Sequence, residues 1–83
     1  MPNEAKIRAA LLDANKDYNH RFNHVIGFLE ATGWKLRIKG SHRIFTRSGC
    51  PFLLNLQPEK TGKAKAYQIR QVRQLLLLYD LHS

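Results

Sequence analysis

A change in the spacing of apolar residues decides the fold of this chain, and it falls in residues 33–47, which read GWKLRIKGSHRIFTR. Before this stretch, apolar residues recur every three or four positions, as on one side of a helix. Within it, three apolar residues alternate with three cations up to Gly40, and a second alternating run follows. A period of two is typical of a strand with one buried and one solvated face. The stretch therefore predicts a β-hairpin whose solvated face is basic.

The register of this hairpin depends on the length of its loop. A two-residue loop would place Arg43 on the core face, whereas a three-residue loop over 40–42 keeps the apolar residues of both strands together. We expect the three-residue loop, which sets Lys39 opposite Arg43 and Lys35 opposite Arg47. Like charges that face each other across two strands are destabilising, so this register suggests a surface that binds an anion.

The solvated face of the predicted hairpin combines cations with one aromatic ring. Its members are Lys35, Arg37, Lys39, Arg43 and Arg47, with Phe45 among them. An aromatic ring surrounded by cations suits the stacking of an unpaired nucleic-acid base. The other interpretation of Phe45 is that the N-terminal helix or a partner protein covers it.

The net charge of +8 comes from the same part of the chain. Residues 1–33 carry four basic and four acidic side chains, whereas residues 34–83 carry ten basic side chains against Glu59 and Asp80. An unbalanced positive surface favours a polyanionic partner such as RNA, because phosphate contacts and released counterions supply affinity. A solvated surface that only maintains solubility is the alternative.

The remaining pattern predicts a single α+β domain over residues 1–83, with a helical extension over 1–19 and a core over 20–80. The expected elements follow the order α-β-β-β-α after an additional N-terminal helix: helices over 3–14, 20–32 and 66–79, and strands over 34–39, 43–47 and 52–57. The resulting three-stranded antiparallel sheet packs on two helices and leaves its other face solvated. The basic loop over 59–65 is expected to be mobile.

The last helix is expected to have a wide apolar sector opposite a polar side that includes Gln68 and Arg73. Leu75, Leu77 and Leu78 widen this sector beyond what one sheet covers. They are available for the N-terminal helix or for a partner chain, a second copy of this protein included. An interaction protein that binds its partner through this helix is therefore one function to consider.

Several classes of protein are excluded by what the sequence lacks. The single cysteine, Cys50, allows no intramolecular disulfide and no paired-thiolate zinc site. His20 and His24 are one helical turn apart but have no third ligand, and no phosphate-loop or dinucleotide motif occurs, so we expect no metal and no cofactor. No secretory signal or bilayer-spanning run is visible, so we expect a cytoplasmic protein without a membrane partner.

The histidine at the end of the glycine turn is the candidate for acid–base chemistry. His42 follows Ser41 and precedes Arg43. A histidine both accepts and donates a proton near neutral pH, which suits attack by a ribose 2′-hydroxyl on the adjacent phosphate. Lys39 and Arg43 are placed to neutralise the charge that builds on the phosphoryl oxygens. The alternative is a solvated turn residue without a chemical role.

The segment 33–45 resembles the signature of the HicA toxins, small bacterial proteins that cleave RNA. In that family a helix ends at a glycine and an aromatic residue, and a Gly-Ser-His triplet follows one strand later. Gly40, Ser41 and His42 match this triplet in order and in distance from Gly33. The resemblance covers about residues 20–80 and implies an α-β-β-β-α fold like that of a double-stranded-RNA-binding domain.

The resemblance also implies a function. It suggests the toxin component of a type II toxin–antitoxin system, a metal-independent endoribonuclease that cleaves messenger RNA with His42 as the catalytic residue. Gly40 and Ser41 would belong to the RNA-binding surface, and Lys63 and Lys65 would hold phosphates as basic residues do in double-stranded-RNA-binding domains. A HicB-like antitoxin would be the protein partner.

One part of the family pattern is missing here. Many relatives carry a Pro-x-His motif in or just after the third strand, but residues 54–58 read LNLQP and contain no histidine. A non-catalytic RNA-binding module of the same fold is therefore the alternative function.

Overall fold

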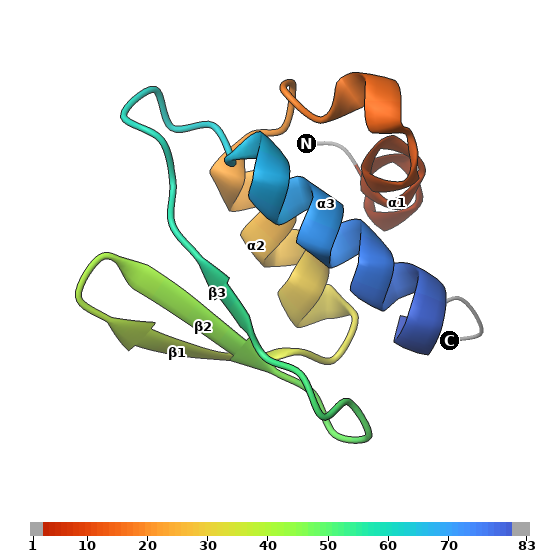
Figure 1. Cartoon of the computed structure of the whole chain (residues 1–83), viewed down its shortest axis with the longest axis vertical. Helices are drawn as coiled ribbons and strands as arrows, with labels where there is room; N and C mark the ends of the chain where they lie inside the picture. The colour runs from red at the N-terminus through yellow and green to blue at the C-terminus, as the bar shows by residue number, and fades with distance from the viewer. Residues whose placement is uncertain (1–2, 81–83) are drawn as a thin grey trace.

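The computed structural model describes residues 3–80 and shows an α+β fold with a three-stranded antiparallel sheet (Figure 1). The elements are α1 (Glu4–Leu12), the short 3-10 turn η1 (Ala14–Lys16), α2 (Phe22–Ala31), β1 (Lys35–Lys39), β2 (His42–Thr46), β3 (Leu54–Leu56), α3 (Ala66–Leu75) and the π-helical turn η2 (Leu76–Asp80). The predicted order of helices and strands is confirmed.

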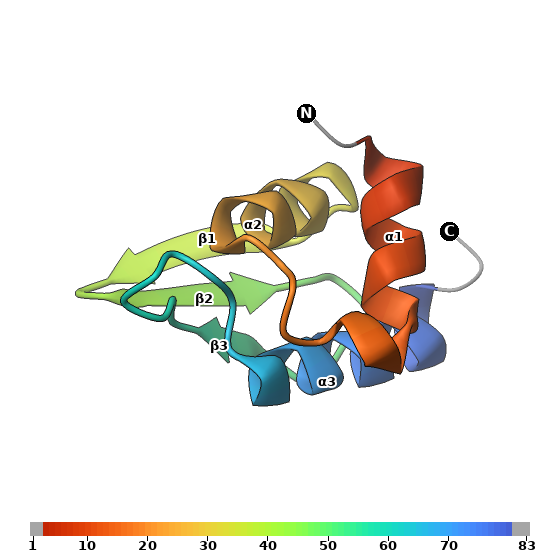
Figure 2. The same cartoon turned by 90° about the horizontal axis from the view of Figure 1, so that it is seen from above.

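The sheet and the helices form separate layers. The strands lie in the order β1-β2-β3, with α2 on the side of β1 and α3 on the side of β3 (Figure 2). Helix α1 packs on α2 and α3 at the end of the helix pair that lies away from the hairpin loop. One face of the sheet, called here the inner face, therefore meets the helices, and the outer face meets solvent.

The helix ends follow from particular residues. Asn3 caps α1, because its side-chain oxygen accepts a hydrogen bond from the backbone N–H of Lys6 at 2.9 Å. After α2, Gly33 adopts a positive φ of 96°, and the N–H of Trp34 then bonds the carbonyl of Leu29. This reversal delivers the chain to β1 with Trp34 already buried.

The core includes the N-terminal helix. Leu11 is fully buried together with Phe28 and Leu29 of α2 and Phe45 of β2. The segment predicted as an extension thus supplies part of the apolar interior that α2 and α3 need on the side away from the sheet.

The hairpin register differs from the prediction. The sheet pairs Lys39 with His42, so the loop consists of Gly40 and Ser41 alone, and the expected three-residue loop is wrong. Gly40 has a φ of 62°, and none of the described non-glycine residues has a positive φ. A positive φ at the first loop residue only is the pattern of a type II′ turn, whose twist matches that of the flanking strands.

This register exchanges the faces of several residues. Leu36 pairs with Phe45, which pairs with Leu54, and this row lies on the inner face. Arg43 lies in the next row of the same face. The expected three-residue loop would have kept this arginine off the core face. Arg43 is tolerated there because it sits at the end of the sheet, in an open groove of about 300 Å³ that Ile26 also lines.

The loop before α3 is fastened to the start of α2. The N–H of Ala64 bonds the carbonyl of His20 at 2.9 Å, and the N–H of Phe22 bonds the carbonyl of Gly62 at 3.0 Å. Within the loop, the N–H of Glu59 bonds the carbonyl of Lys63 at 2.8 Å. These three bonds connect the loop to the start of α2, and the mobility of the loop stays a prediction.

Candidate nucleic-acid interface

The outer face of the sheet is positively charged, as the sequence predicted for a solvated face, but the residues on it differ from those predicted. Its residues are Lys35, Arg37 and Lys39 of β1, His42, Ile44 and Thr46 of β2, and Asn55 of β3. All except the half-buried Ile44 are exposed. No acidic residue occurs between Glu30 and Glu59, so none of the three strands supplies a carboxylate to neutralise these cations.

His42 is held by a neighbour on the third strand. Its Nδ1 lies 2.8 Å from the Oδ1 of Asn55. In the tautomer that carries its hydrogen on Nδ1, His42 donates to this amide oxygen and keeps the lone pair of Nε2 free. Lys39 lies directly opposite His42 on the same face. The arrangement combines an oriented imidazole with an adjacent ammonium group.

Asn55 is itself positioned by a buried residue of α3. The side chain of Gln68 accepts a hydrogen bond from the N–H of Gln57 at 3.1 Å and donates one to the carbonyl of Asn55 at 3.3 Å. Gln68 thus binds β3 along the edge that faces α3, as a neighbouring strand would. The side chain of Gln57, the residue after β3, also donates to the hydroxyl of Ser41 at 3.2 Å, which connects the hairpin loop to the end of that strand.

These partners of His42 were missed in the sequence. Gln68 was expected on the polar side of the last helix, yet only 5% of its surface is exposed. For Asn55 the sequence predicted only a place in the third strand. The Gly-Ser sequence of the hairpin loop does indicate the correct register. A glycine followed by serine is typical of a two-residue loop, and a two-residue loop places His42 and Asn55 on the same face of the sheet.

Three residues predicted for the basic face lie elsewhere. Phe45 is completely buried on the inner face, so the prediction of an exposed ring for base stacking is wrong. Arg43 faces the groove at the start of α2 rather than the outer face. Arg47 follows β2 and donates a hydrogen bond from Nη1 to the carbonyl of Tyr79 at 3.2 Å, so it binds the η2 turn rather than facing solvent with the outer cations.

The lysines before α3 lie outside the sheet. Lys63 is exposed and forms an isolated antiparallel bridge with Arg21 just before α2. Lys65 is the half-buried residue at the start of α3. The structure therefore places these two predicted phosphate ligands beside the first turns of two helices and not beside His42.

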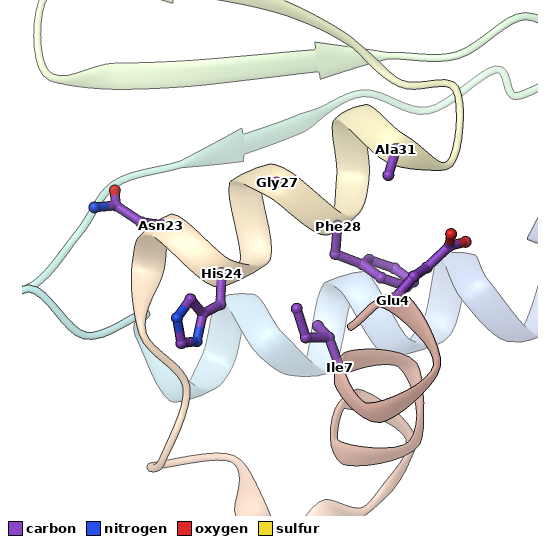
Figure 3. Close-up of a pocket in the computed structure, with 7 residues that line it drawn as sticks. All are labelled: Glu4, Ile7, Asn23, His24, Gly27, Phe28 and Ala31. Carbon is purple, nitrogen blue, oxygen red and sulfur yellow. The ribbon is translucent and has the colours of Figure 1, made fainter. Parts of the chain in front are cut away.

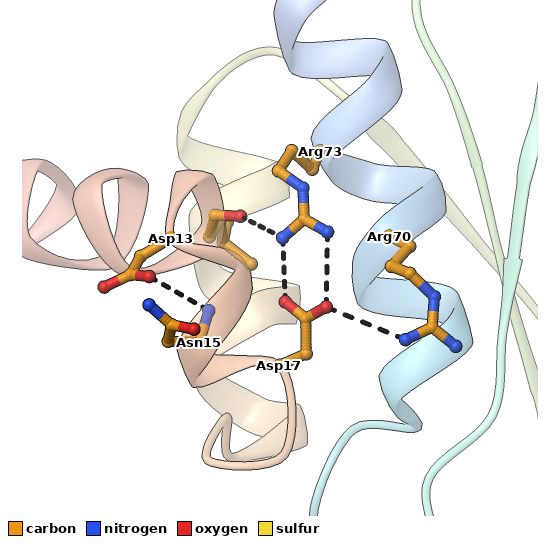
Figure 4. Close-up of polar contacts among 6 residues, drawn as sticks. Asp13, Asn15, Asp17, Arg70 and Arg73 are labelled. Atoms are coloured by element: carbon orange, nitrogen blue, oxygen red, sulfur yellow. Dashed lines mark hydrogen bonds and ion pairs between the residues drawn. The ribbon is translucent and has the colours of Figure 1, made fainter.

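A second polar cluster has a structural role. Asp17 accepts hydrogen bonds from both terminal nitrogens of Arg73, at 2.7 and 3.2 Å, and Arg70 lies 3.8 Å away (Figure 4). The Arg73 hydrogen bond holds the pKa of Asp17 below its usual value. His20 is also buried beside this cluster, and burial lowers its pKa because the charged imidazole would lose its water.

An open groove separates α1 from α2 and has no connection with His42. Its volume is about 230 Å³, and Ile7, Phe28 and Gly27 form its apolar floor, with Glu4 and His24 among its other lining residues (Figure 3). Within residues 3–80, no three His, Cys, Asp or Glu residues come close enough to hold a metal ion.

No protein-family model, curated protein or solved structure matches this chain. No helix in the described range is long and apolar enough to cross a membrane.

Proposed function

We propose that this protein is an endoribonuclease of the HicA toxin type, which cleaves single-stranded messenger RNA on the outer face of its sheet. The observation that carries the proposal is the hydrogen bond of 2.8 Å between His42 Nδ1 and Asn55 Oδ1. This contact holds the imidazole of His42 in one orientation, and a fixed orientation is what distinguishes a catalytic base from a freely rotating surface side chain. As in other such toxins, a HicB-like antitoxin would restrain the activity.

The proposed reaction needs no metal. The Nε2 of His42 takes the proton of a ribose 2′-hydroxyl, and the 2′-oxygen attacks the adjacent phosphorus. The bond to the 5′-oxygen of the next nucleotide breaks, and that oxygen gains a proton from the imidazolium or from water. Lys39 compensates the negative charge that builds on the phosphoryl oxygens. The products are a 2′,3′-cyclic phosphate and a 5′-hydroxyl end.

RNA binding is assigned to the same face. Lys35 and Arg37 continue the line of cations from Lys39, so they would contact successive phosphates of one strand. Ile44 is half-buried at the centre of the face and would give a base an apolar surface in place of the buried Phe45.

The test is cleavage of a single-stranded RNA of mixed sequence by the full chain and by His42→Ala. The variant should lose cleavage by about 100- to 10,000-fold, since a positioned general base contributes that much, and should keep its RNA affinity. His24→Ala, in the groove between α1 and α2, is the matched control and should cleave normally. Cleavage by the His42 variant at the rate of the original protein would refute the assignment.

The second candidate is a non-catalytic RNA-binding module. It is favoured by one observation, that His42 is the only histidine on the three described strands, whereas related proteins place a second one nearby. An original protein that binds RNA in a salt-dependent way but leaves it intact would establish this alternative.

A further inference from the structure

The first strand of the sheet is open along one side. The order β1-β2-β3 leaves β1 at an edge, and α2 packs on its inner face rather than against that edge (Figure 1). The other edge of the sheet is different, because Gln68 binds the backbone of β3 there. Among residues 3–80, the backbone hydrogen bonds outside the strand ladders include none from Leu36 or Ile38.

The loop length determines which backbone groups of β1 face the open edge. The residues that flank a two-residue loop exchange both of their hydrogen bonds, and such pairs then alternate along the hairpin. Lys39, Arg37 and Lys35 therefore bond to β2. The N–H and C=O groups of Leu36 and Ile38 point the other way and are free to pair with another strand.

The side chains of β1 add a pattern to this edge. Three cations occupy the outer face, whereas Leu36 and Ile38 occupy the inner face. Ile38 is 65% exposed although it is one of the larger apolar side chains, because it lies near the hairpin loop beyond the cover of α2. A strand added here would meet positive charge on one face and uncovered apolar surface on the other.

We propose that the β1 edge binds an extended acidic segment of another protein as a fourth strand. Its Asp or Glu residues would alternate with apolar residues, so that the acids pair with the outer cations and the apolar side chains cover Ile38. A second copy of β1 fits poorly, because its own cations would lie across from those of the first copy. The lysines and arginine thus oppose self-association at an edge that remains open to a segment of opposite charge.

The added strand would also regulate the site. Its acids would occupy Lys35, Arg37 and Lys39, the same cations that RNA would contact, so the segment and RNA would compete. This step rests on the proposed function, whereas binding of the segment does not.

The binding test uses a short end-blocked peptide of alternating glutamate and valine. Hydrogen exchange of the full-length protein, followed by NMR, should slow at least about 10-fold at the Leu36 and Ile38 amides, while the Arg37 and Lys39 amides, already paired with β2, should change little. The same peptide N-methylated at alternate residues should not bind, because it lacks the edge-facing donors. A polyglutamate of equal charge should bind more weakly and without this alternation.

A variant tests the protein side of the contact. Ile38→Pro removes the N–H that faces the edge but none that bonds β2, and proline is tolerated at such edge positions. It should abolish peptide binding, whereas Ile38→Thr should retain most of it. The N-methylated peptide gives the same answer without any change to the protein, so a folding defect in the proline variant leaves the test intact.

The outcomes separate the two proposals. Three results would overturn strand addition. They are equal binding of all three peptides, no binding of any peptide, and dimerisation of the free protein with protection of the Leu36 and Ile38 amides. Slower RNA cleavage in the presence of the alternating peptide alone would support competition. Peptide binding without any RNA cleavage by the protein would support strand addition and overturn the proposed function.

Discussion

At the scale of single residues, the function proposed here depends on one side-chain amide. Asn55 lies on β3, next to the strand of His42, and it makes the contact that gives His42 a defined orientation. Its own backbone is fixed by Gln68, so the position of the imidazole depends on three residues from three elements. Asn55 is thus a positioning residue rather than a group that touches the substrate.

Replacing Asn55 tests this role. Asn55→Ala leaves the His42 ring without its partner, and we expect cleavage to slow by about 100-fold while RNA affinity stays within a few-fold of the original. The measurement is single-turnover cleavage with RNA binding followed separately. Thr46→Ala, on the same face but without a contact to His42, should cleave normally, and equal loss in both variants would contradict a specific role for Asn55.

Two arginines that are close in sequence should differ in their effect on RNA binding. Arg37 lies on the outer face and Arg43 on the inner face. Arg37→Ala should weaken binding and reduce the slope of log K against log salt by about 0.7, the value for one phosphate contact with a single strand. Arg43→Ala should leave that slope unchanged, and the opposite result would mean that RNA binds the inner side of the hairpin.

At the scale of elements, the sequence was sufficient for the helices and strands but not for how the strands pair. The two spacings of apolar residues predicted each element to within a few residues at its ends. The register failed because Arg43 was assumed unable to lie on the inner face, although that face is uncovered at the hairpin end. The contact of His42 with Asn55 could not be predicted, since it depends on the pairing of β1 with β2 and of β2 with β3 together.

The hydrogen bonds of Gln68 to the backbone of Asn55 and Gln57 can be tested by removing its side chain. Gln68→Ala would leave the carbonyl of Asn55 and the N–H of Gln57 without their partners at a partly buried position. We expect the free energy of unfolding in urea to fall by about 1–3 kcal/mol. Because β3 would lose its support, cleavage should also slow at temperatures where the variant is fully folded. An unchanged cleavage rate in the folded variant would show that His42 is oriented without α3.

At the scale of the whole molecule, two buried ionisable residues connect the N-terminal segment to α3. Asp17 pairs with Arg73, and His20 lies buried close to the same pair. The folded state holds both pKa values below the ordinary values of 3.8 and 6.5. Each residue therefore links stability to pH, in separate ranges.

Stability should fall in two steps on acidification. Below about pH 6.5 the unfolded chain protonates His20 while the folded chain resists, so the free energy of unfolding decreases until the folded imidazole is also charged. The contribution of Asp17 is complete above about pH 3.8 and is lost as the pH falls through its lower folded pKa. Urea unfolding from about pH 8 down to about pH 3 measures the first step in full, and its extension to about pH 1 follows the second.

His20→Leu separates the two contributions. The variant should lose the first step and keep the second, because Asp17 and Arg73 remain paired. A variant that retains the first step would show that another group titrates there.

The uneven distribution of charge along the chain has a consequence for the proposed encounter with RNA. Residues 34–57 contain five basic and no acidic side chains, whereas the helical segment before them sums to zero and residues 58–83 add a net charge of +3. The segment with the strands is therefore the most positive part of the molecule. A nearby polyanion would attract this part most strongly, beginning at a separation of about one Debye length, roughly 8 Å in physiological salt. Under the proposed function, RNA would then be oriented toward the sheet that carries His42 before the two molecules touch.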